Sequence, residues 1–205
     1  SFKDPLPSAQ SPIAKLVTEY PIKSEAVICH IRQANSGGIC LENTHPFTRQ
    51  MWGKNWTYAH NGQLKDFQQV LPIKFHLPIG TTDSEHAFCW ILDQLHIQFA
   101  EHQPSEEVLF KFIAKLSEKI NKLGVFNLII SNGDCLFAYC STKLHWITRR
   151  APFGEASLID AEIVVDFHKE TTANDVVTVI ATQPLTDDET WQQMKAGQWQ
   201  LFCLG

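Results

Sequence analysis

Two helix-like segments in the middle of the chain, followed almost only by strand-like segments, constrain the fold more than any other feature of this sequence. Residues 82–99 and 105–123 carry apolar side chains at helical spacing, and from Val125 onward short β-prone runs alternate with turn residues. The helices are clustered instead of alternating with strands. The pattern predicts one mixed domain of the α+β class.

The ends of the two predicted helices are marked in the sequence. Thr82 and Glu85 have the Thr-x-x-Glu spacing of a capping box, in which each side chain bonds the backbone N–H of the other residue. In the second segment acidic residues lead, lysines trail and Gly124 follows, which complements the helix dipole and stops the helix. The apolar face predicted for the first helix consists of Phe88, Ile91, Leu92, Leu95 and Phe99.

The flanking segments predict one further helix and several strands. Ser11-Pro12 marks a helix start with the serine as cap, and Pro21 ends that helix. Asn61-Gly62 is a strong turn signal after a short strand at 56–60. Further strands are expected at 26–31, 125–130, 135–140, 143–148, 161–167, 176–181 and 199–204, with a hairpin turn at 131–134 and a short helix at 186–195.

Length and charge limit the classes of function. The 205 residues suit a single domain over 1–205 with a substantial core. The net charge of −5, without a basic run, gives no electrostatic footprint for nucleic acid. No apolar run is long enough to span a bilayer, and no secretory or transit signal is visible. These features predict a cytoplasmic protein that binds neither nucleic acid nor membranes.

The cysteines and histidines show no metal-ligand spacing. The six cysteines form no CxxC pair and most lie in apolar segments, so buried reduced thiols are expected and a zinc ribbon is not. A disulfide between Cys135 and Cys140 is not expected, because the two flank one predicted strand. The histidines are dispersed, and no phosphate-binding or dinucleotide motif is present. Neither a metal nor another cofactor is expected.

Two charged residues between His30 and Asp83 could bind an amino acid. Arg32 follows a predicted strand and could grip a carboxylate with two hydrogen bonds, although an isolated arginine is more often an ordinary surface residue. Asp83 could receive an ammonium group, although the dipole of the helix that starts there would by itself explain a carboxylate. Together they would form a receptor for an α-amino acid.

Asn61-Gly62 also has two interpretations. The dipeptide is typical of a hairpin turn, but an asparagine amide beside an unobstructed glycine N–H is equally suited to hold an oxyanion. His45 and His60 could act as acid–base groups, while a lone histidine is more often structural. Trp52 and Trp56 are expected in the core or in a pocket wall.

Four short motifs, in this order and spacing, resemble the class II glutamine amidotransferases, which are N-terminal-nucleophile (Ntn) hydrolases. They are His30-Ile31-Arg32-Gln33-Ala34-Asn35-x-Gly37, Asn43-Thr44-His45-Pro46, His60-Asn61-Gly62 and Thr82-Asp83-Ser84-Glu85. The sequences of segments 43–47, 56–64 and 181–186 are similar to those of the YafJ-type subgroup. The resemblance covers essentially the whole chain. It implies a four-layer αββα sandwich with antiparallel sheets.

The resemblance implies a role for each matching residue. Arg32 would bind the α-carboxylate of glutamine and Asp83 its α-ammonium, while the Asn61 side chain and the Gly62 N–H would hold the oxyanion. Asn35 and His45 match positions close to the substrate. The implied reaction is the attack of a cysteine thiolate on the side-chain amide of glutamine, the release of ammonia and the hydrolysis of the thioester to glutamate.

The cysteine nucleophile of the family is not found at the start of this sequence. The family's nucleophile stands at the mature N-terminus, whereas this sequence opens with Ser1 and residues that resemble an internal segment of the family. Cys29, on the predicted strand before Arg32, is expected to be a buried structural thiol and not a substitute. The expectation is therefore a domain without its N-terminal strand and nucleophile.

Three functions stay open at this point. The first is glutaminase or amidotransferase chemistry on glutamine or a γ-glutamyl amide, in which transfer of the ammonia would need a partner protein, because no synthase domain lies within these residues. The second is a non-catalytic glutamine-binding or regulatory subunit. The third is an Ntn amidase with a different acyl substrate.

Overall fold

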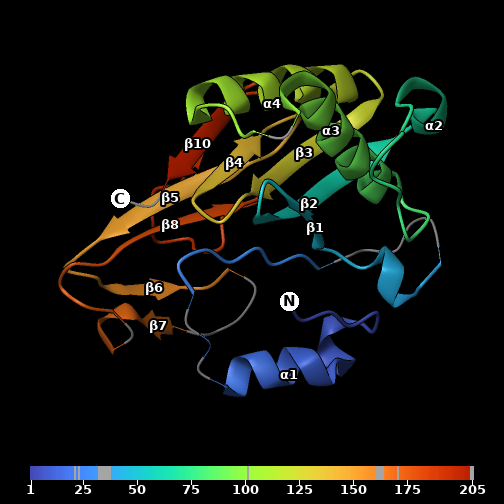
Figure 1. Ribbon diagram of the computed structural model, residues 1–205. Helices are drawn as coiled ribbons and strands as arrows, with labels where there is room; N and C mark the ends of the chain where they lie inside the picture. Colours follow the sequence, from blue (N-terminus) through green and yellow to red (C-terminus); the bar gives the residue numbers. More distant parts are fainter. Residues whose placement is uncertain are drawn as a thin grey trace.

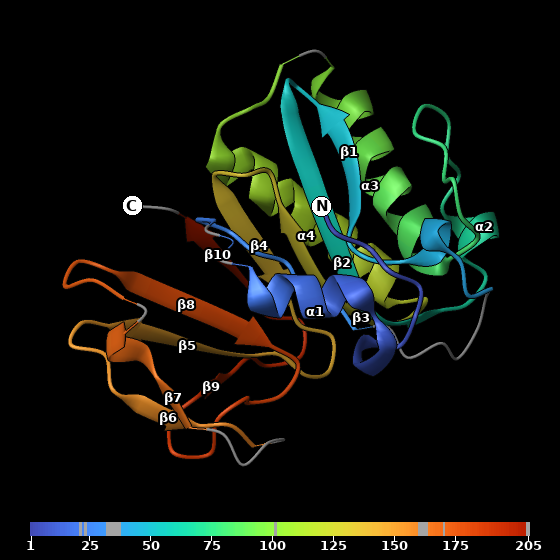
Figure 2. The same ribbon diagram turned by 90° about the horizontal axis from the view of Figure 1, so that it is seen from below.

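A computed structural model describes residues 1–20, 22, 24–31, 38–100, 102–159, 164–169 and 171–203 of the chain. Within these ranges the long helices α3 (Asp83–Phe99) and α4 (Glu106–Asn121) cover one face of a large antiparallel sheet (Figure 1). A smaller sheet and the short helix α1 (Pro12–Glu19) lie on the other side, and the view from below shows α1 in front of the strands (Figure 2). The predicted α+β class with antiparallel sheets is confirmed.

The large sheet positions the His60-Asn61-Gly62 motif within its longest strand, β2. Its strands are β1 (Phe47–Met51), β2 (Lys54–Leu64), β3 (Gly124–Ser131), β4 (Cys135–Tyr139) and β10 (Trp199–Cys203). Their order is β1-β2-β3-β4-β10, and every neighbouring pair is antiparallel. The predicted hairpin of β3 and β4 is confirmed. β2 lies inside the sheet, between the edge strand β1 and the inner strand β3.

The main core lies between α3, α4 and the large sheet. Trp56 and Tyr58 from β2, together with Phe88 and Trp90 from α3, are at most 1% exposed. The rings of Tyr58 and Phe88 stack with 4.9 Å between their centroids. Full burial of a large apolar side chain contributes about 1.5–3 kcal/mol. This interface therefore holds the start of α3 in a fixed place relative to β2.

The smaller sheet packs against the large one through a second, smaller core. It has the order β8-β5-β9, with β5 (His145–Arg150), β8 (Val176–Ala181) and β9 (Gln192–Gln193). A separate pair joins β6 (Glu155–Ser157) to β7 (Val164–Asp166). The strands predicted at 143–148 and 176–181 correspond to β5 and β8, and β7 falls in the strand predicted at 161–167, of which 161–163 lie outside the described residues. The second core comprises Ala138, Cys140, Leu144 and Met194.

Helix α1 begins as the sequence predicts but buries none of its residues. The Ser11 hydroxyl oxygen accepts a hydrogen bond from the Ala14 N–H at 3.0 Å, which confirms the cap. Leu16 and Val17, on its apolar face, are 43% and 44% exposed. The remaining short elements are α2 (Phe67–Val70) and the 3₁₀ turns Ser8–Gln10, Leu41–Asn43 and Phe167–Lys169. In the described part of the chain, no helix has the length and apolar character needed to span a membrane.

Two predicted elements are wrong. Residues 26–31 form no strand, although the segment carries β-prone side chains, because no neighbouring strand pairs with it in the described structure. The helix predicted at 186–195 is also absent. There the Thr186 hydroxyl donates to Glu189 Oε2 at 2.6 Å and accepts from Trp191 Nε1 at 2.9 Å. Such local side-chain bonds favour a turn over a helix.

Candidate active site

The candidate site is built around the last residues of β2, where the strand extends beyond its neighbour β1. Pairing with β1 ends at Tyr58, whereas pairing with β3 continues to Leu64. Asn61 and Gly62 therefore lie inside a strand, and the hairpin turn predicted at these residues is wrong. The reason is that β3 supplies a partner for every residue of this stretch, which outweighs the local turn preference of Asn-Gly.

Gly62 directs its backbone N–H to the edge of β2 that β1 leaves open. The Lys65 N–H donates to Leu123 O at 2.9 Å in the same antiparallel register, so odd-numbered residues of this stretch bond to β3. Because antiparallel pairing alternates, even-numbered residues direct their N–H to the other edge. Leu64 does so, since its N–H donates to Asp83 Oδ2 at 2.7 Å. Gly62 stands two residues earlier on that edge.

Only glycine fits at position 62. Its φ is +154°, and a Cβ atom built there would lie 1.9 Å from the backbone oxygen of Val125. That oxygen also contacts His60, whose Nε2 is 3.0 Å away. The absence of a side chain therefore allows β3 to approach the Gly62 backbone closely.

A buried asparagine that the sequence analysis did not single out supports Asn61 from β3. Asn127 is 4% exposed and donates from Nδ2 to the backbone oxygen of Asn61 at 3.2 Å. Its Oδ1 accepts from the N–H groups of Ser141 and Thr142, both at 3.0 Å. The Asn61 side chain itself is exposed. One signal could have found Asn127, because it is a polar residue within an apolar strand.

The first turn of α3 carries the predicted cap, with one difference. Thr82 Oγ1 accepts from the Glu85 N–H at 3.1 Å, as expected of a capping box. The expected return bond from the Thr82 N–H to the Glu85 side chain is wrong. The Glu85 carboxylate instead accepts from the N–H groups of Ile79 at 3.1 Å and Gly80 at 2.7 Å. It also forms an ion pair with Arg49. The side chain thereby fixes the loop that leads into α3.

Asp83 and Ser84 connect α3 with the end of β2. Asp83 Oδ2 accepts from the Leu64 N–H at 2.7 Å, and its Oδ1 accepts from the Ser84 N–H at 2.9 Å. The Ser84 hydroxyl lies 2.9 Å from Nδ1 of His60. The motifs at 60–62 and 82–85, which are far apart in sequence, are therefore in direct contact.

His60 is a neutral, fully engaged side chain. Its Nε2 faces the Val125 carbonyl oxygen, which can only accept, so Nε2 carries the proton and Nδ1 accepts from Ser84. Burial lowers the pKa of His60, against opposing effects of the Val125 hydrogen bond and the Asp83 charge. Of the two interpretations of this histidine, the structural one fits these contacts.

Asn43 connects two further motifs to the same region. Its Nδ2 donates to Gly38 O at 3.1 Å, directly after residues 32–37, and its Oδ1 accepts from the Thr81 N–H at 2.8 Å. A Cβ atom at Gly80 would lie 2.3 Å from Asn43 Oδ1. Asn43 therefore joins Gly38 to Thr81, which directly precedes the cap of α3.

The remaining predicted site residues are placed only in part. His45 is 5% exposed, and its ring stacks on His30 with 4.1 Å between the centroids and lies 4.6 Å from the ring of Phe47. Arg32 and Asn35 lie outside the described residues. Among the described candidates, the structure thus brings Gly62 and Asp83 to one strand edge, and Asn61 precedes Gly62 on the same strand.

The cysteines differ from the expected buried thiols. Cys135 and Cys203 are opposite residues of β4 and β10 and form a disulfide, so the expectation of reduced thiols is wrong for this pair. They are 68 residues apart in sequence, and only strand pairing brings them together. Cys29 is exposed, not buried, because residues 26–31 form no strand that would cover it. Cys89 and Cys140 are buried, as expected.

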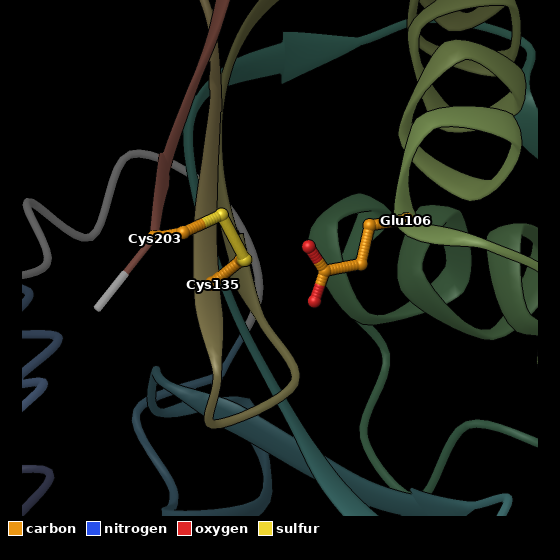
Figure 3. A group of neighbouring side chains, drawn as sticks. All are labelled: Glu106, Cys135 and Cys203. Atoms are coloured by element: carbon orange, nitrogen blue, oxygen red, sulfur yellow. A yellow bond between two sulfur atoms is a disulfide. The ribbon is translucent and has the colours of Figure 1, made fainter. Parts of the chain in front are cut away.

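The same disulfide lies beside a carboxylate. In the described part of the chain, Glu106, Cys135 and Cys203 form the one group of three ligand-type side chains, with ligand atoms within 4.8 Å of one another (Figure 3). Metal ions are bound by thiolates, and a disulfide offers none. As it stands, the group supplies a single carboxylate from the start of α4, which is too little to hold a metal.

Two cavities of about 390 Å³ each lie away from these residues. One is lined by β5 and β6 and includes Arg149, which forms an ion pair with Glu189. The other lies between residues 24–27, the β3–β4 turn and β8. Neither is lined by Asn61, Gly62 or Asp83.

Two antiparallel sheets, the larger covered on one face by α3 and α4, with a Gly-containing strand edge joined to a helix start, match a fold of the Ntn-hydrolase type of glutamine amidotransferases. The family model described as "Glutamine amidotransferases class-II" matches residues 1–205. The chain belongs to this family.

Similar proteins from bacteria extend over the whole chain. It is 58% identical over 205 residues to "Putative glutamine amidotransferase YafJ" of Escherichia coli. The match covers 100% of this chain and 80% of that protein. A Haemophilus influenzae protein described as "Putative glutamine amidotransferase" is 45% identical over 204 residues, and the match covers 100% of this chain and 69% of that protein.

A solved structure supports the fold. It is titled as the crystal structure of a predicted glutamine amidotransferase from Pseudomonas aeruginosa and is 54% identical, with a TM-score of 0.76. The match covers 85% of this chain and 68% of that one. A class-II domain protein from Silicibacter pomeroyi, 19% identical with a TM-score of 0.51, covers 97% of this chain and 78% of that one and shows the fold alone.

Proposed function

We propose that this chain binds glutamine, or a γ-glutamyl amide, and cleaves its side-chain amide through a cysteine thioester. The observation that carries the proposal is the hydrogen bond from the Leu64 N–H to Asp83 Oδ2 at 2.7 Å. This bond supports the proposal because the register directs the Gly62 N–H to the same strand edge, in a chain that belongs to the class II glutamine amidotransferases.

The spacing along this edge suits the substrate. Successive residues of a strand rise about 3.4 Å, so the N–H groups of Gly62 and Leu64 are separated by about 6.8 Å. In glutamine, four bonds of about 1.5 Å separate the α-nitrogen from the side-chain amide carbon. A glutamine with its ammonium group at Asp83 is therefore long enough for its amide to reach Gly62.

Each end of the substrate would be held by charge or by directed hydrogen bonds. Asp83 receives the α-ammonium, and Arg32 binds the α-carboxylate with its fork of donors. At the reacting end, the Gly62 N–H and the exposed Asn61 side-chain amide hold the oxygen that becomes negative. Asn35 and His45 complete the surroundings of the substrate.

The proposed reaction has two steps. A thiolate forms a bond to the side-chain amide carbon of glutamine, and the carbonyl electron pair moves to oxygen. When the carbonyl re-forms, the C–N bond breaks and nitrogen leaves with an added proton as ammonia. Water then attacks the thioester, which yields glutamate and restores the thiol. In amidotransferases the ammonia passes to an acceptor, which we propose is bound by a partner protein or a further domain.

We propose that the thiolate belongs to a cysteine outside residues 1–205, at the mature N-terminus, with its own α-amine as base. Four of the six cysteines support this choice, and for the exposed Cys29 and the half-buried Cys40 the labelling experiment below is the test. Cys135 and Cys203 form a disulfide, Cys89 and Cys140 are buried, and burial raises the pKa of the Cys89 thiol to about 11. A thiol of that pKa carries little thiolate at neutral pH.

The test uses the full-length protein and an electrophilic glutamine analogue. We expect glutamine to release glutamate and ammonia, and the analogue to label a single N-terminal cysteine, located by mass spectrometry of the digested protein. Replacing Asn61 by Ala should lower kcat about 100-fold or more, because one oxyanion donor contributes about 3 kcal/mol. Arg32→Ala should abolish glutamine use.

The other outcomes of this test identify the alternatives. A native protein that begins at Ser1, binds glutamine and releases no ammonia would be a non-catalytic binding subunit. Hydrolysis that Arg32→Ala leaves unchanged would indicate an amidase with a different acyl substrate.

A further inference from the structure

We propose that His60 is a positioning residue that fixes the distance between the two ends of the substrate site. The inference rests on the proposed function of Gly62 and Asp83 and goes beyond it, because it assigns a task to a side chain that itself would not touch the substrate. The imidazole lies between the strand that supports Gly62 and the helix turn that carries Asp83.

The first contact of the imidazole controls the backbone at Gly62. His60 Nε2 donates to Val125 O at 3.0 Å. The same oxygen lies 1.9 Å from the point where a Cβ of Gly62 would stand, and His60 Nε2 lies 2.8 Å from that point. The carbonyl and the ring therefore close the space around the Gly62 α-carbon, so the direction of the Gly62 peptide depends on both.

The second contact controls the start of α3. The Ser84 hydroxyl donates to His60 Nδ1 at 2.9 Å. Ser84 follows Asp83 directly, and its N–H donates to Asp83 Oδ1 at 2.9 Å. A shift of the imidazole would therefore move the carboxylate proposed to receive the ammonium group.

Burial makes both contacts difficult to replace. His60 is 2% exposed and Ser84 5%, and the imidazole packs against Phe126 with 4.9 Å between the ring centroids. Water cannot take the place of a lost partner in such surroundings, so a buried polar group without a partner would force the neighbouring backbone to move. Displacing a reacting group by about 1 Å can lower a rate about 100-fold.

The two contacts can be removed separately. Asparagine carries its amide on Cγ, where the imidazole carries Nδ1, so His60→Asn keeps a partner for Ser84 and removes the donor to Val125. Glutamine carries its amide one atom further, near Nε2, so His60→Gln keeps the donor to Val125 and removes the partner of Ser84. A residue that only stabilises the fold would give similar kinetics in both variants.

Kinetics of the full-length protein with glutamine test the proposal. We expect His60→Asn to lower kcat about 10- to 100-fold with a smaller change in KM, because the oxyanion donor is displaced. His60→Gln should raise KM more than it lowers kcat, because the ammonium site moves. Ser84→Ala should give the same KM effect as His60→Gln, and the two effects should not add in the double variant.

His86→Asn is the matched control. His86 is also a buried histidine of the region, and its Nε2 bonds Leu71 O at 2.8 Å, away from Gly62. This variant should lower stability and keep the parent's kcat and KM. Equal kinetic profiles for His60→Asn and His60→Gln, in proteins shown to be folded, would overturn the positioning role.

A spectroscopic measurement separates this inference from the proposed function. In ¹⁵N NMR spectra of the full-length protein, His60 should show a protonated Nε2, and the Gly62 amide signal should shift in His60→Asn and much less in His60→Gln. A parent protein without glutaminase activity that shows these shifts would contradict the function and support the role of His60. Active protein with an unmoved Gly62 signal in both variants would contradict the role alone.

Discussion

The carboxylate of Asp83 accepts a hydrogen bond from the backbone N–H of Leu64 at 2.7 Å, across 19 residues of sequence. This bond joins the first turn of α3 to the open edge of β2. A carboxylate at a helix start is stabilised by the helix dipole, so its presence needs no substrate. Its contact with the strand edge next to Gly62 brings the residue proposed to bind the ammonium group of glutamine close to the residue proposed to hold the amide oxygen.

The charge of Asp83 should matter more for binding glutamine than for folding. Asp83→Asn keeps an oxygen that can accept from Leu64 but loses the negative charge. A hydrogen bond to a charged group contributes about 1.5–3 kcal/mol, so KM for glutamine should rise about 10- to 100-fold. Steady-state kinetics of the full-length protein measure this change. Asp187→Asn, at an exposed acid, is the control, and an unchanged KM in Asp83→Asn would remove this residue from the site.

Gly62 should not tolerate a methyl group. Gly62→Ala would place its Cβ 1.9 Å from a backbone oxygen, so the free energy of unfolding should fall by about 3 kcal/mol or more. Gly53 also has a positive φ, of +73°, but no atom lies within 4 Å of its Cβ position. Gly53→Ala should therefore cost only about 1 kcal/mol. Urea denaturation measures both values, and equal losses would contradict the close approach at Gly62.

Asp93 should make the stability depend on pH below about 4. Its buried carboxylate accepts from the N–H groups of Phe75 and His76 and from His76 Nδ1 at 2.8 Å. Burial opposes ionisation, but the hydrogen bonds from Lys74 and His76 outweigh it and hold the pKa of Asp93 below its usual 3.8. The contribution is therefore present above pH 3.8 and is lost as the pH falls through the lower, folded-state pKa.

The corresponding variant is Asp93→Asn. It should lower the free energy of unfolding at pH 7 by about 2 kcal/mol and reduce the further loss on acidification. Urea denaturation of parent and variant at neutral and at acid pH measures both effects. A variant that loses as much stability as the parent between the two pH values would show that another group is responsible.

The Cys135–Cys203 disulfide should stabilise the domain. It closes a loop of 68 residues, and constraining the unfolded chain in this way contributes about 2–4 kcal/mol. Reductant, or Cys203→Ser, should lower the free energy of unfolding by that amount. Alkylation of the denatured chain should modify four of the six cysteines before reduction and all six after it. Six modified cysteines before reduction would show that the pair is not bonded.

Local patterns predicted the elements that depend on near neighbours in sequence. The apolar spacing of 82–99 and 105–123, the Ser11 cap and the hairpin turn at 131–134 were sufficient, because these features satisfy their backbone within a few residues. The family motifs also predicted that Asn61, Gly62 and Asp83 belong to one site. Their proposed roles remain predictions.

The errors occurred where distant partners decide the conformation. Asn61-Gly62 carries a turn signal but lies within β2, because it pairs with Asn127 and Phe126 of β3, which are more than 60 positions later in the sequence. Residues 26–31 carry β-prone side chains but have no partner strand in the described structure. The Cys135–Cys203 bond depends on the pairing of β4 with β10.

The sequence by itself determined the fold class, the family and the residue types of the site, because periodicity and short motifs are properties of neighbouring residues. Only the tertiary structure decided that the Gly62 N–H and Asp83 share one strand edge, with His60 between the strand and the helix. The physical reason is that antiparallel register determines which backbone N–H groups are left free at an edge. Register is set by partners far away along the chain, so no local pattern contains it.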